Sequence, residues 1–358
     1  MNVSRMQSLT KDLIAIDSVT GREAEITDYL VNYLNEIGMK TNEFVVDGNR
    51  RNILACHNEI YRLLFNTHID TVPQQYGPHE DSQRIYGRGA CDTHGILAAQ
   101  LEAMADLREE GVSDIGLLLV VGEETFHDGA THAGKSEIVP PDFLIVGEPT
   151  ENKLMTAQKG SLKADLTVYG NEGHSGYPEY FNSAIERLVD LLQRFWQCDW
   201  LSADSRNGTT ANVTFRENSH FDNQIPGKAA VRLMFRCAQP CAEVKQLFLA
   251  FLSQAAEQMN LKNAELFNLQ WLMGQGEPIE LNTVPDFELG MAAYNTDIHY
   301  FNWTQTKIFL MGSGSVLNAH RDLRNANWLE GEWLSKEEQI RSVHLYKKLA
   351  RGLLGGGA

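Results

Sequence analysis

An apolar segment that ends in two adjacent carboxylates constrains this chain more than any other feature. The run at residues 116–122 holds only Leu and Val between two glycines, and Glu123 and Glu124 follow it directly. Short continuous apolar runs of this kind are typical of strands that are buried on both faces. Charge at the edge of a core is costly, so it is retained mainly where a metal ion or a reaction uses it.

Three more apolar runs are followed by imidazole or carboxylate side chains in the same way. They are residues 63–65 with His68 and Asp70 beyond, residues 143–146 with Glu148, and residues 308–311 with His320. We therefore expect a metal site at the carboxyl ends of four strands. Two His together with carboxylates suit Zn²⁺, Co²⁺ or Mn²⁺ better than metals that prefer thiolates.

Individual residues of this set have ordinary alternatives. His68 and Asp70 point the same way if the segment is extended, so the carboxylate could fix the imidazole tautomer, but a hydrogen-bonded surface pair has the same spacing. Asp92 follows a glycine-containing segment and could bridge two metal ions or simply cap the next helix. Of Glu123 and Glu124, one could bind metal while its neighbour acts as a general base toward water.

Strands that alternate with helical segments predict an α/β layered domain with a mostly parallel central sheet. The expected strands are residues 52–55, 62–67, 115–121, 143–146 and 307–310, and the expected helices are residues 9–16, 24–34 and 95–109. The pattern changes after Lys159, where the strands alternate apolar and polar residues. Strands at 162–169, 212–216 and 229–237 with helices at 184–196 and 244–259 predict a small antiparallel sheet, inserted into the first domain.

Length and charge exclude several classes of protein. A chain of 358 residues is long enough for two domains. Its net charge of -16 argues against binding to nucleic acid or to an anionic membrane surface. The sequence shows neither a signal peptide nor a membrane span, and its 5 Cys lack paired motifs, so we expect reduced thiols and a cytoplasmic location.

The motifs, taken together and in order, resemble those of the M20 family of di-metal amidohydrolases and peptidases. The similarity is to acetylornithine, acetylcitrulline and succinyl-diaminopimelate deacylases in particular. The segments that carry it are residues 68–73, 86–92, 122–124, 147–150, 173–176 and 319–320. They extend over almost the whole chain.

The resemblance implies a set of roles for the site residues. One metal ion would be held by His68, Asp92 and Glu148, and the other by Asp92, Glu124 and His320. Glu123 would be the general base, and Asp70 would support the ligands without touching metal. The resemblance also implies a cis peptide bond after Asp92. Two zinc ions are the expected cofactors, with cobalt or manganese as alternatives.

The resemblance further implies that residues 160–273 form a lid and dimerisation domain with a four-stranded antiparallel sheet. Residues 1–159 and 274–358 would then form a three-layer catalytic domain. On the lid, His174 would stabilise the oxyanion, in its own subunit or in a second one. The expected substrate-binding residues are Asn223, Arg236, Gly312, Ser313 and Gly314. Arg321 and Arg324 could receive an anionic acyl group such as succinyl, or could lie on the outside.

The resemblance, together with these motifs, leads us to expect a cytoplasmic, homodimeric, zinc-dependent hydrolase that cleaves the amide bond of a small N-acyl amino acid. A dipeptidase or carboxypeptidase on the same scaffold, or a desuccinylase, is the nearest alternative. A two-metal phosphoesterase is disfavoured by the scarcity of basic residues in the motifs. A catalytically silent metal-binding protein is disfavoured by Glu123, because such a protein needs no base that is not a ligand.

Overall fold

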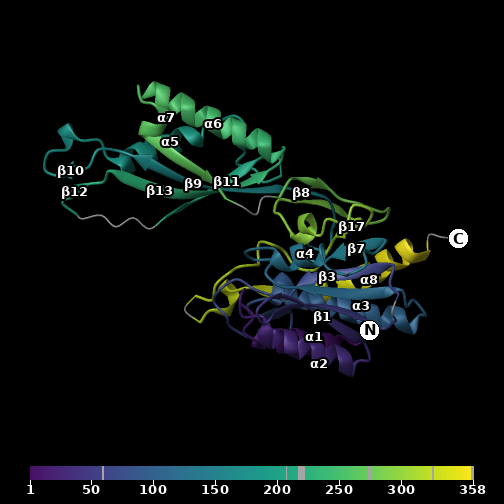
Figure 1. Ribbon diagram of the computed structural model, residues 1–358. Coiled ribbons are helices and arrows are strands. Elements are labelled where there is room, and N and C mark those ends of the chain that lie inside the picture. Colours follow the sequence, from purple (N-terminus) through teal and green to yellow (C-terminus); the bar gives the residue numbers. More distant parts are fainter. Residues whose placement is uncertain (59, 207, 217–221, 273–275, 325, 356–358) are drawn as a thin grey trace. The chain divides into compact units, whose positions relative to one another are not determined.

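The chain folds into two compact units in the computed structural model, which describes residues 1–58, 60–206, 208–216, 222–272, 276–324 and 326–355 (Figure 1). Unit 1 comprises residues 1–156, 280–292 and 296–358, and unit 2 comprises residues 157–279 and 293–295. The chain passes between them within β8 (Leu154–Gln158), within β15 (Ile279–Glu280), and again after residues 292 and 295. The boundary that we expected at residues 273 and 274 lies outside the described residues.

Unit 1 is built on a six-stranded sheet with the order β1-β2-β6-β3-β7-β17. The four strands β6, β3, β7 and β17 run parallel, and β1 and β2 add an antiparallel edge. These six strands are β1 (Lys40–Asp47), β2 (Arg50–Cys56), β3 (Leu63–His68), β6 (Ile115–Val120), β7 (Phe143–Val146) and β17 (Lys307–Leu310). The sheet confirms the predicted α/β fold with a mostly parallel centre.

The central strands are buried on both faces, as their continuous apolar sequences predict. On β6, Leu117 and Leu119 join the main core, while Leu118 and Val120 point to the opposite face and are also fully buried. Four helices contribute to the main core (Figure 1): α1 (Val3–Ala15), α2 (Ala24–Glu36), α3 (Gly95–Glu109) and α8 (Lys336–Gly355). The remaining elements of unit 1 are β4 (His79–Glu80), β5 (Arg84–Tyr86), η1 (Ala90–His94), α4 (Asp128–Ala133), β16 (Leu289–Ala292), η3 (Asp297–Tyr300), η4 (Trp328–Glu330) and β18 (Trp333–Ser335).

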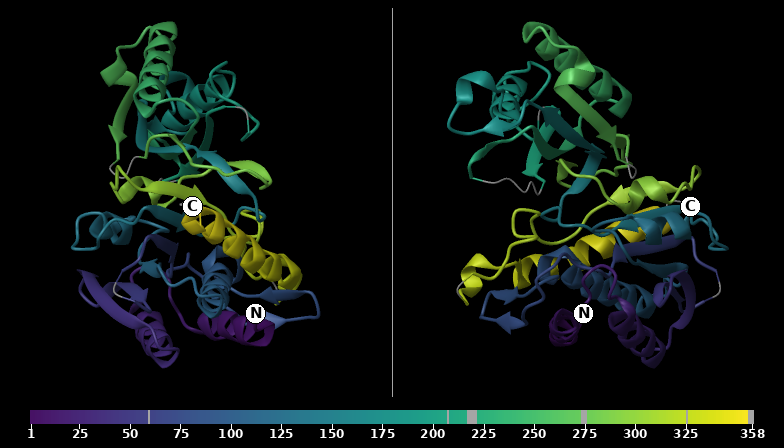
Figure 2. Two further views of the ribbon diagram at one scale, coloured as in Figure 1. Left: turned by 90° about the vertical axis from the view of Figure 1, so that its right-hand side faces the viewer. Right: turned by 60° about the vertical axis from the view of Figure 1, so that its left-hand side comes forward.

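Unit 2 contains the predicted antiparallel sheet, with four strands in the order β11-β13-β9-β14. Alternate residues of β9, including Leu162, Leu166 and Val168, share one core with α5 and α6, so both helices cover the same face of this sheet (Figure 2). The elements are β9 (Gly160–Tyr169), β10 (Gly173–His174), η2 (Pro178–Tyr180), α5 (Ala184–Phe195), β11 (Thr210–Phe215), β12 (Gln224–Ile225), β13 (Lys228–Cys237), α6 (Cys241–Gln258), α7 (Asn263–Leu266) and β14 (Phe267–Trp271).

Several elements escape the pattern analysis, and β1, β14 and α8 are three of them. The strand β1 is mostly exposed and polar, so it lacks the apolar run on which the prediction depended. The short strand β14 supplies the fourth strand of the unit 2 sheet by pairing with β9. The helix α8 packs on α3, and its charged sequence carries only a narrow apolar stripe.

Candidate metal centre

The strand ends converge because β6, β3 and β7 are parallel and in close register. His68 pairs with Val120, so His68 lies level with a residue three positions before Glu123. Asn66 pairs with Val146, which places Glu148 just beyond the same edge of the sheet. Parallel strands deliver the residues at their carboxyl ends to one edge. The structure thus brings together the strand-end residues that the sequence singled out.

Asp92 lies between two imidazoles, with one oxygen toward each. Oδ1 of Asp92 is 3.1 Å from Nε2 of His68, and Oδ2 is 3.4 Å from Nε2 of His320. Nε2 of His320 is also 3.0 Å from Oε1 of Glu124. When each ligand lies about 2.0 Å from a tetrahedral zinc ion, neighbouring ligand atoms are about 3.3 Å apart. The spacing of these donor atoms therefore fits a divalent ion among His68, Asp92 and Glu124, and His320 lies beside the last two.

The backbone around Asp92 is held by a buried carboxylate from the C-terminal part of the chain. Oε1 of Glu332 accepts the N–H groups of Cys91 and Asp92, both at 3.1 Å. Oε2 of Glu332 accepts from Nη1 of the buried Arg88 at 2.8 Å. The peptide bond between Asp92 and Thr93 is cis, as the resemblance predicts. Asp92 is thus fixed through its main chain as well as through its side chain.

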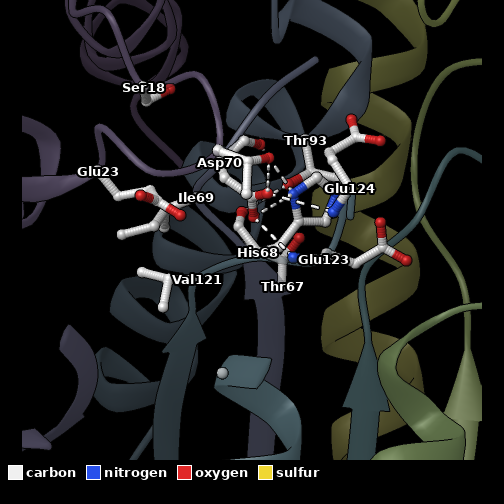
Figure 3. Close-up of polar contacts among 12 residues, drawn as sticks. Ser18, Glu23, Thr67, His68, Ile69, Asp70, Thr93, Val121, Glu123 and Glu124 are labelled. Atoms are coloured by element: carbon white, nitrogen blue, oxygen red, sulfur yellow. Dashed lines mark hydrogen bonds and ion pairs between the residues drawn. The ribbon is translucent and has the colours of Figure 1, made fainter. Parts of the chain in front are cut away.

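Asp70 lies beside the candidate ligands and forms hydrogen bonds with them (Figure 3). Its carboxylate accepts the backbone N–H of Glu123 at 3.0 Å and that of Glu124 at 3.2 Å, and also the hydroxyl of Thr20 at 2.7 Å. Nδ1 of His68 lies 2.9 Å from the backbone carbonyl of Asp70 and 3.5 Å from its carboxylate. The carbonyl is therefore the closer partner, and it leaves Nε2 of His68 facing Asp92.

The carboxylates of the cluster differ in how their surroundings affect protonation. Burial is the largest of the effects that raise the pKa of Glu123 to about 8. The nearby carboxylates of Asp297 and Glu124 act in the same direction, and His127 and His68 oppose them. Burial also raises the pKa of Glu124 and, more strongly, that of Glu148. An accumulation of buried carboxylates is costly without a compensating cation, so a metal ion fits this donor set.

Asp92 and the two imidazoles are biased toward their charged forms. Burial would raise the pKa of Asp92, but its hydrogen bonds with His320 and His68 outweigh burial and lower it. Burial would lower the pKa of His320, but Asp92 and Glu124 raise it to about 11. The pKa of His68 is raised in the same way by Asp70 and Asp92. A bound metal ion would attract the same carboxylates and would replace the imidazolium protons.

The loop that precedes His320 packs against this cluster. A Cβ at Gly312 would lie 2.4 Å from the backbone oxygen of Glu148, so only glycine fits there. Gly314 has a φ of +81°, and a Cβ there would lie 2.5 Å from Sγ of Cys91. The hydroxyl of Ser313 is buried and lacks a hydrogen-bond partner among the described residues. Arg321 and Arg324 are both exposed.

The residues that we expected on the lid lie in unit 2. His174 is exposed on β10, and its Nδ1 accepts the N–H of Gly176 at 3.0 Å. Asn223 is exposed, and its backbone oxygen accepts the N–H of Ser175 at 3.0 Å. Arg236 lies on β13 and is partly buried. Their roles toward a substrate stay predictions.

Two features beside the cluster were not found from the sequence. Glu332 follows a turn rather than a strand, so no strand-end pattern marks it. His127 and Asp297 form a pair, with Nδ1 of His127 3.0 Å from Oδ1 of Asp297. The four-residue spacing of Glu123 and His127 is the one signal that could have indicated proximity, but this segment forms turns rather than a helix.

The fold and the donor set define an α/β protein with a candidate two-metal centre. Residues 64–322 match the model of peptidase family M20/M25/M40. An M20 domain-containing protein of Schizosaccharomyces pombe is 30% identical over 321 residues, which cover 87% of this chain and 78% of that protein. A probable carboxypeptidase of Uncinocarpus reesii is 30% identical over 404 residues, with 99% of this chain and 88% of that protein covered.

The chain therefore belongs to peptidase family M20/M25/M40, and it is a hydrolase of that family. Among solved structures, a tripeptidase of Staphylococcus aureus has the same fold, with a TM-score of 0.77 at 20% identity over 98% of this chain and 99% of that one. Within the described ranges, the helices of this chain do not combine the length and apolar character that crossing a membrane requires.

Proposed function

We propose that this protein cleaves the amide bond of a small N-acyl amino acid and releases a carboxylate and the free amino acid. The observation that carries the proposal is the placement of Glu123. It is a partly buried carboxylate beside the cluster of His68, Asp92 and Glu124, yet it is not part of that cluster. Amide hydrolysis uses a general base that is not itself a metal ligand, whereas metal storage needs no such base.

Each residue has a distinct task in this proposal. Two divalent ions, held by His68, Asp92, Glu124, Glu148 and His320, supply an acidified water and polarise the scissile carbonyl when they are bound. Glu123 accepts the proton of the attacking water and then donates it to the leaving amine. Asp70 holds the backbone of Glu123 in place through the N–H that it accepts.

On unit 2, the imidazole of His174 would donate to the developing oxyanion, an interaction typically worth about 3 kcal/mol. Asn223 and Arg236 would bind the free carboxylate of the amino acid, and residues 312–314 would line the substrate site. His174 could act in its own subunit or in a second copy of the chain.

A peptidase is the second candidate, and the names of the relatives support it. The Uncinocarpus reesii protein is named a probable carboxypeptidase, and the Staphylococcus aureus structure is of a tripeptidase. A peptide with a free C-terminus presents the same amide and carboxylate as an N-acyl amino acid. The two activities therefore differ in the group on the acyl side of the bond.

A substrate panel separates the candidates. The zinc- or cobalt-loaded protein would be assayed with acetylornithine, acetylcitrulline, succinyl-diaminopimelate, other acetyl amino acids, dipeptides, tripeptides and N-blocked peptides. The Glu123→Gln variant, which keeps the size of the side chain, is the matched control for contaminating hydrolases. Preferred turnover of one acyl amino acid supports the deacylase, and turnover of peptides alone supports the peptidase. Equal rates in the wild type and the variant would refute both.

A further inference from the structure

A second group of possible ligands lies beside Glu123. Nδ1 of His127 is 3.0 Å from Oδ1 of Asp297 and 3.7 Å from Oε1 of Glu123. One ligand atom from each of these three residues lies within 4.8 Å of the other two. Neighbouring ligands of a tetrahedral zinc ion are about 3.3 Å apart, so small side-chain movements would bring all three to one ion. His, Asp and Glu are all common zinc ligands.

The carboxylate of Asp297 gives an independent indication that a cation could bind here, because one of its two oxygens lacks a partner among the described residues. Asp297 is 2% exposed, and its Oδ2 is buried without a hydrogen bond to any residue that the structure describes. A buried, unpaired carboxylate oxygen costs free energy, and a bound cation would remove that cost. Within the described ranges, neither Asp297 nor Glu123 forms an ion pair with Lys or Arg.

Several contacts orient His127 toward these carboxylates. Its backbone has a φ of 51°, in the left-handed region that few residues other than glycine adopt. Its ring stacks on Tyr300, with the centroids 4.3 Å apart. The next residue, Asp128, is paired with Arg50 on β2. Backbone strain that the surrounding packing maintains is frequent at functional sites.

We propose that Glu123, His127 and Asp297 form a third divalent-cation site, and that Zn²⁺ bound there inhibits hydrolysis. The site should be weaker than the two-metal centre, because its ligand atoms must move closer together to share one ion. Inhibition rests on the proposed function, since a Glu123 carboxylate that binds a cation cannot accept a proton from water. Excess zinc would thus reduce the activity of the protein that zinc activates.

Metal counting tests the site without any substrate. Chelator-treated protein would be dialysed against increasing buffered Zn²⁺, and bound zinc would be measured by mass spectrometry. The wild type should bind two equivalents tightly and a third more weakly. His127→Asn and Asp297→Asn keep hydrogen-bonding side chains of similar size, and the affinity for the third ion should fall at least about tenfold in each. His344→Asn, which alters an exposed His on α8, is the matched control and should retain the third equivalent.

Kinetics then link the site to function. The zinc concentration that halves the activity of the two-zinc protein should rise at least about tenfold in His127→Asn, in line with the loss of binding. A wild type that binds only two equivalents, or variants that bind the third as tightly as the wild type, would overturn the proposal. If the third ion binds as expected but no substrate is hydrolysed, the proposed function fails and the site stands. If substrate is hydrolysed but no third ion binds, the proposed function stands and the third site fails.

Discussion

Removing the Glu332 carboxylate should destabilise the protein strongly, because that group satisfies three buried donors. It accepts two backbone N–H groups, from Cys91 and Asp92, and one N–H from the guanidinium of Arg88. An unsatisfied backbone donor costs about 1 kcal/mol or more, and a lost charge-assisted bond costs about 2 kcal/mol. We expect Glu332→Ala to lower the free energy of unfolding by about 4 kcal/mol, within the range for breaking a buried ion pair.

Glu332→Gln should lower the free energy of unfolding by about half as much, roughly 2 kcal/mol, because it loses only the charge-assisted bond to Arg88. Its amide oxygen can still accept the two backbone N–H groups. Its NH₂ group would face Arg88, but that guanidinium keeps the carboxylate of Asp322 at 2.6 Å and the carbonyls of Pro73 and Gln74. The difference between the two variants thus measures the backbone contacts alone.

Urea unfolding of the metal-free protein, followed by circular dichroism, provides the measurement. With a slope of about 3 kcal/mol per molar urea, the midpoint of Glu332→Ala should fall by about 1.3 M. Glu330→Ala removes an exposed carboxylate two residues away and should stay within about 0.5 kcal/mol of the wild type. The reasoning fails if Glu332→Ala unfolds within about 1 kcal/mol of the wild type, or if the Gln variant is as unstable as the Ala variant.

Three further predictions concern the site and its surroundings. Glu123→Gln should lower kcat by about 10²- to 10⁴-fold while zinc content stays unchanged, and substantial residual activity would remove Glu123 as the base. Asp70→Asn removes one carboxylate oxygen that accepts a backbone N–H, so it should weaken zinc binding about 10- to 100-fold in competition with a chelator. Zinc affinity equal to that of the wild type would contradict this role of Asp70. Burial raises the pKa of Glu23 above 4.5 despite its bonds to Arg50, so the folded state binds this proton more tightly than the unfolded chain. The contribution of Glu23 to the free energy of unfolding should therefore fall as the pH rises from 4.5 through the folded-state pKa. In Glu23→Gln, the urea midpoint should depend less on pH between about pH 4 and 7 than in the wild type.

The candidate ligands could be predicted because local sequence and topology agree at this site. His68, Glu124 and Glu148 each follow an apolar run, and parallel strands deliver such residues to one edge of a sheet. The sheet itself was predictable for the same reason, since its central strands are continuous apolar runs. The polar edge strand β1 carries no such signal, because an edge strand needs no second buried face.

The supporting residues could not be predicted, because tertiary packing alone brings them to the site. Glu332 lies beyond a turn, and Asp297 begins a short helical turn, so neither position follows a periodic pattern. Their partners, Asp92 and His127, lie far from them in the sequence. A single sequence marks which residues can bind a metal ion, but not which distant residues will orient them.

The order of the site residues along the chain has a consequence for synthesis on the ribosome. The strand β17 pairs with β7, and all of residues 157–279 lie between them. His320 and Glu332 follow later still, so a nascent chain that already contains His68, Asp92, Glu124 and Glu148 lacks the second imidazole and the support of Asp92. Closing so long a loop is entropically costly and slow. The candidate metal centre can therefore be completed only after His320 and Glu332 have emerged, so shorter nascent chains should lack the proposed activity.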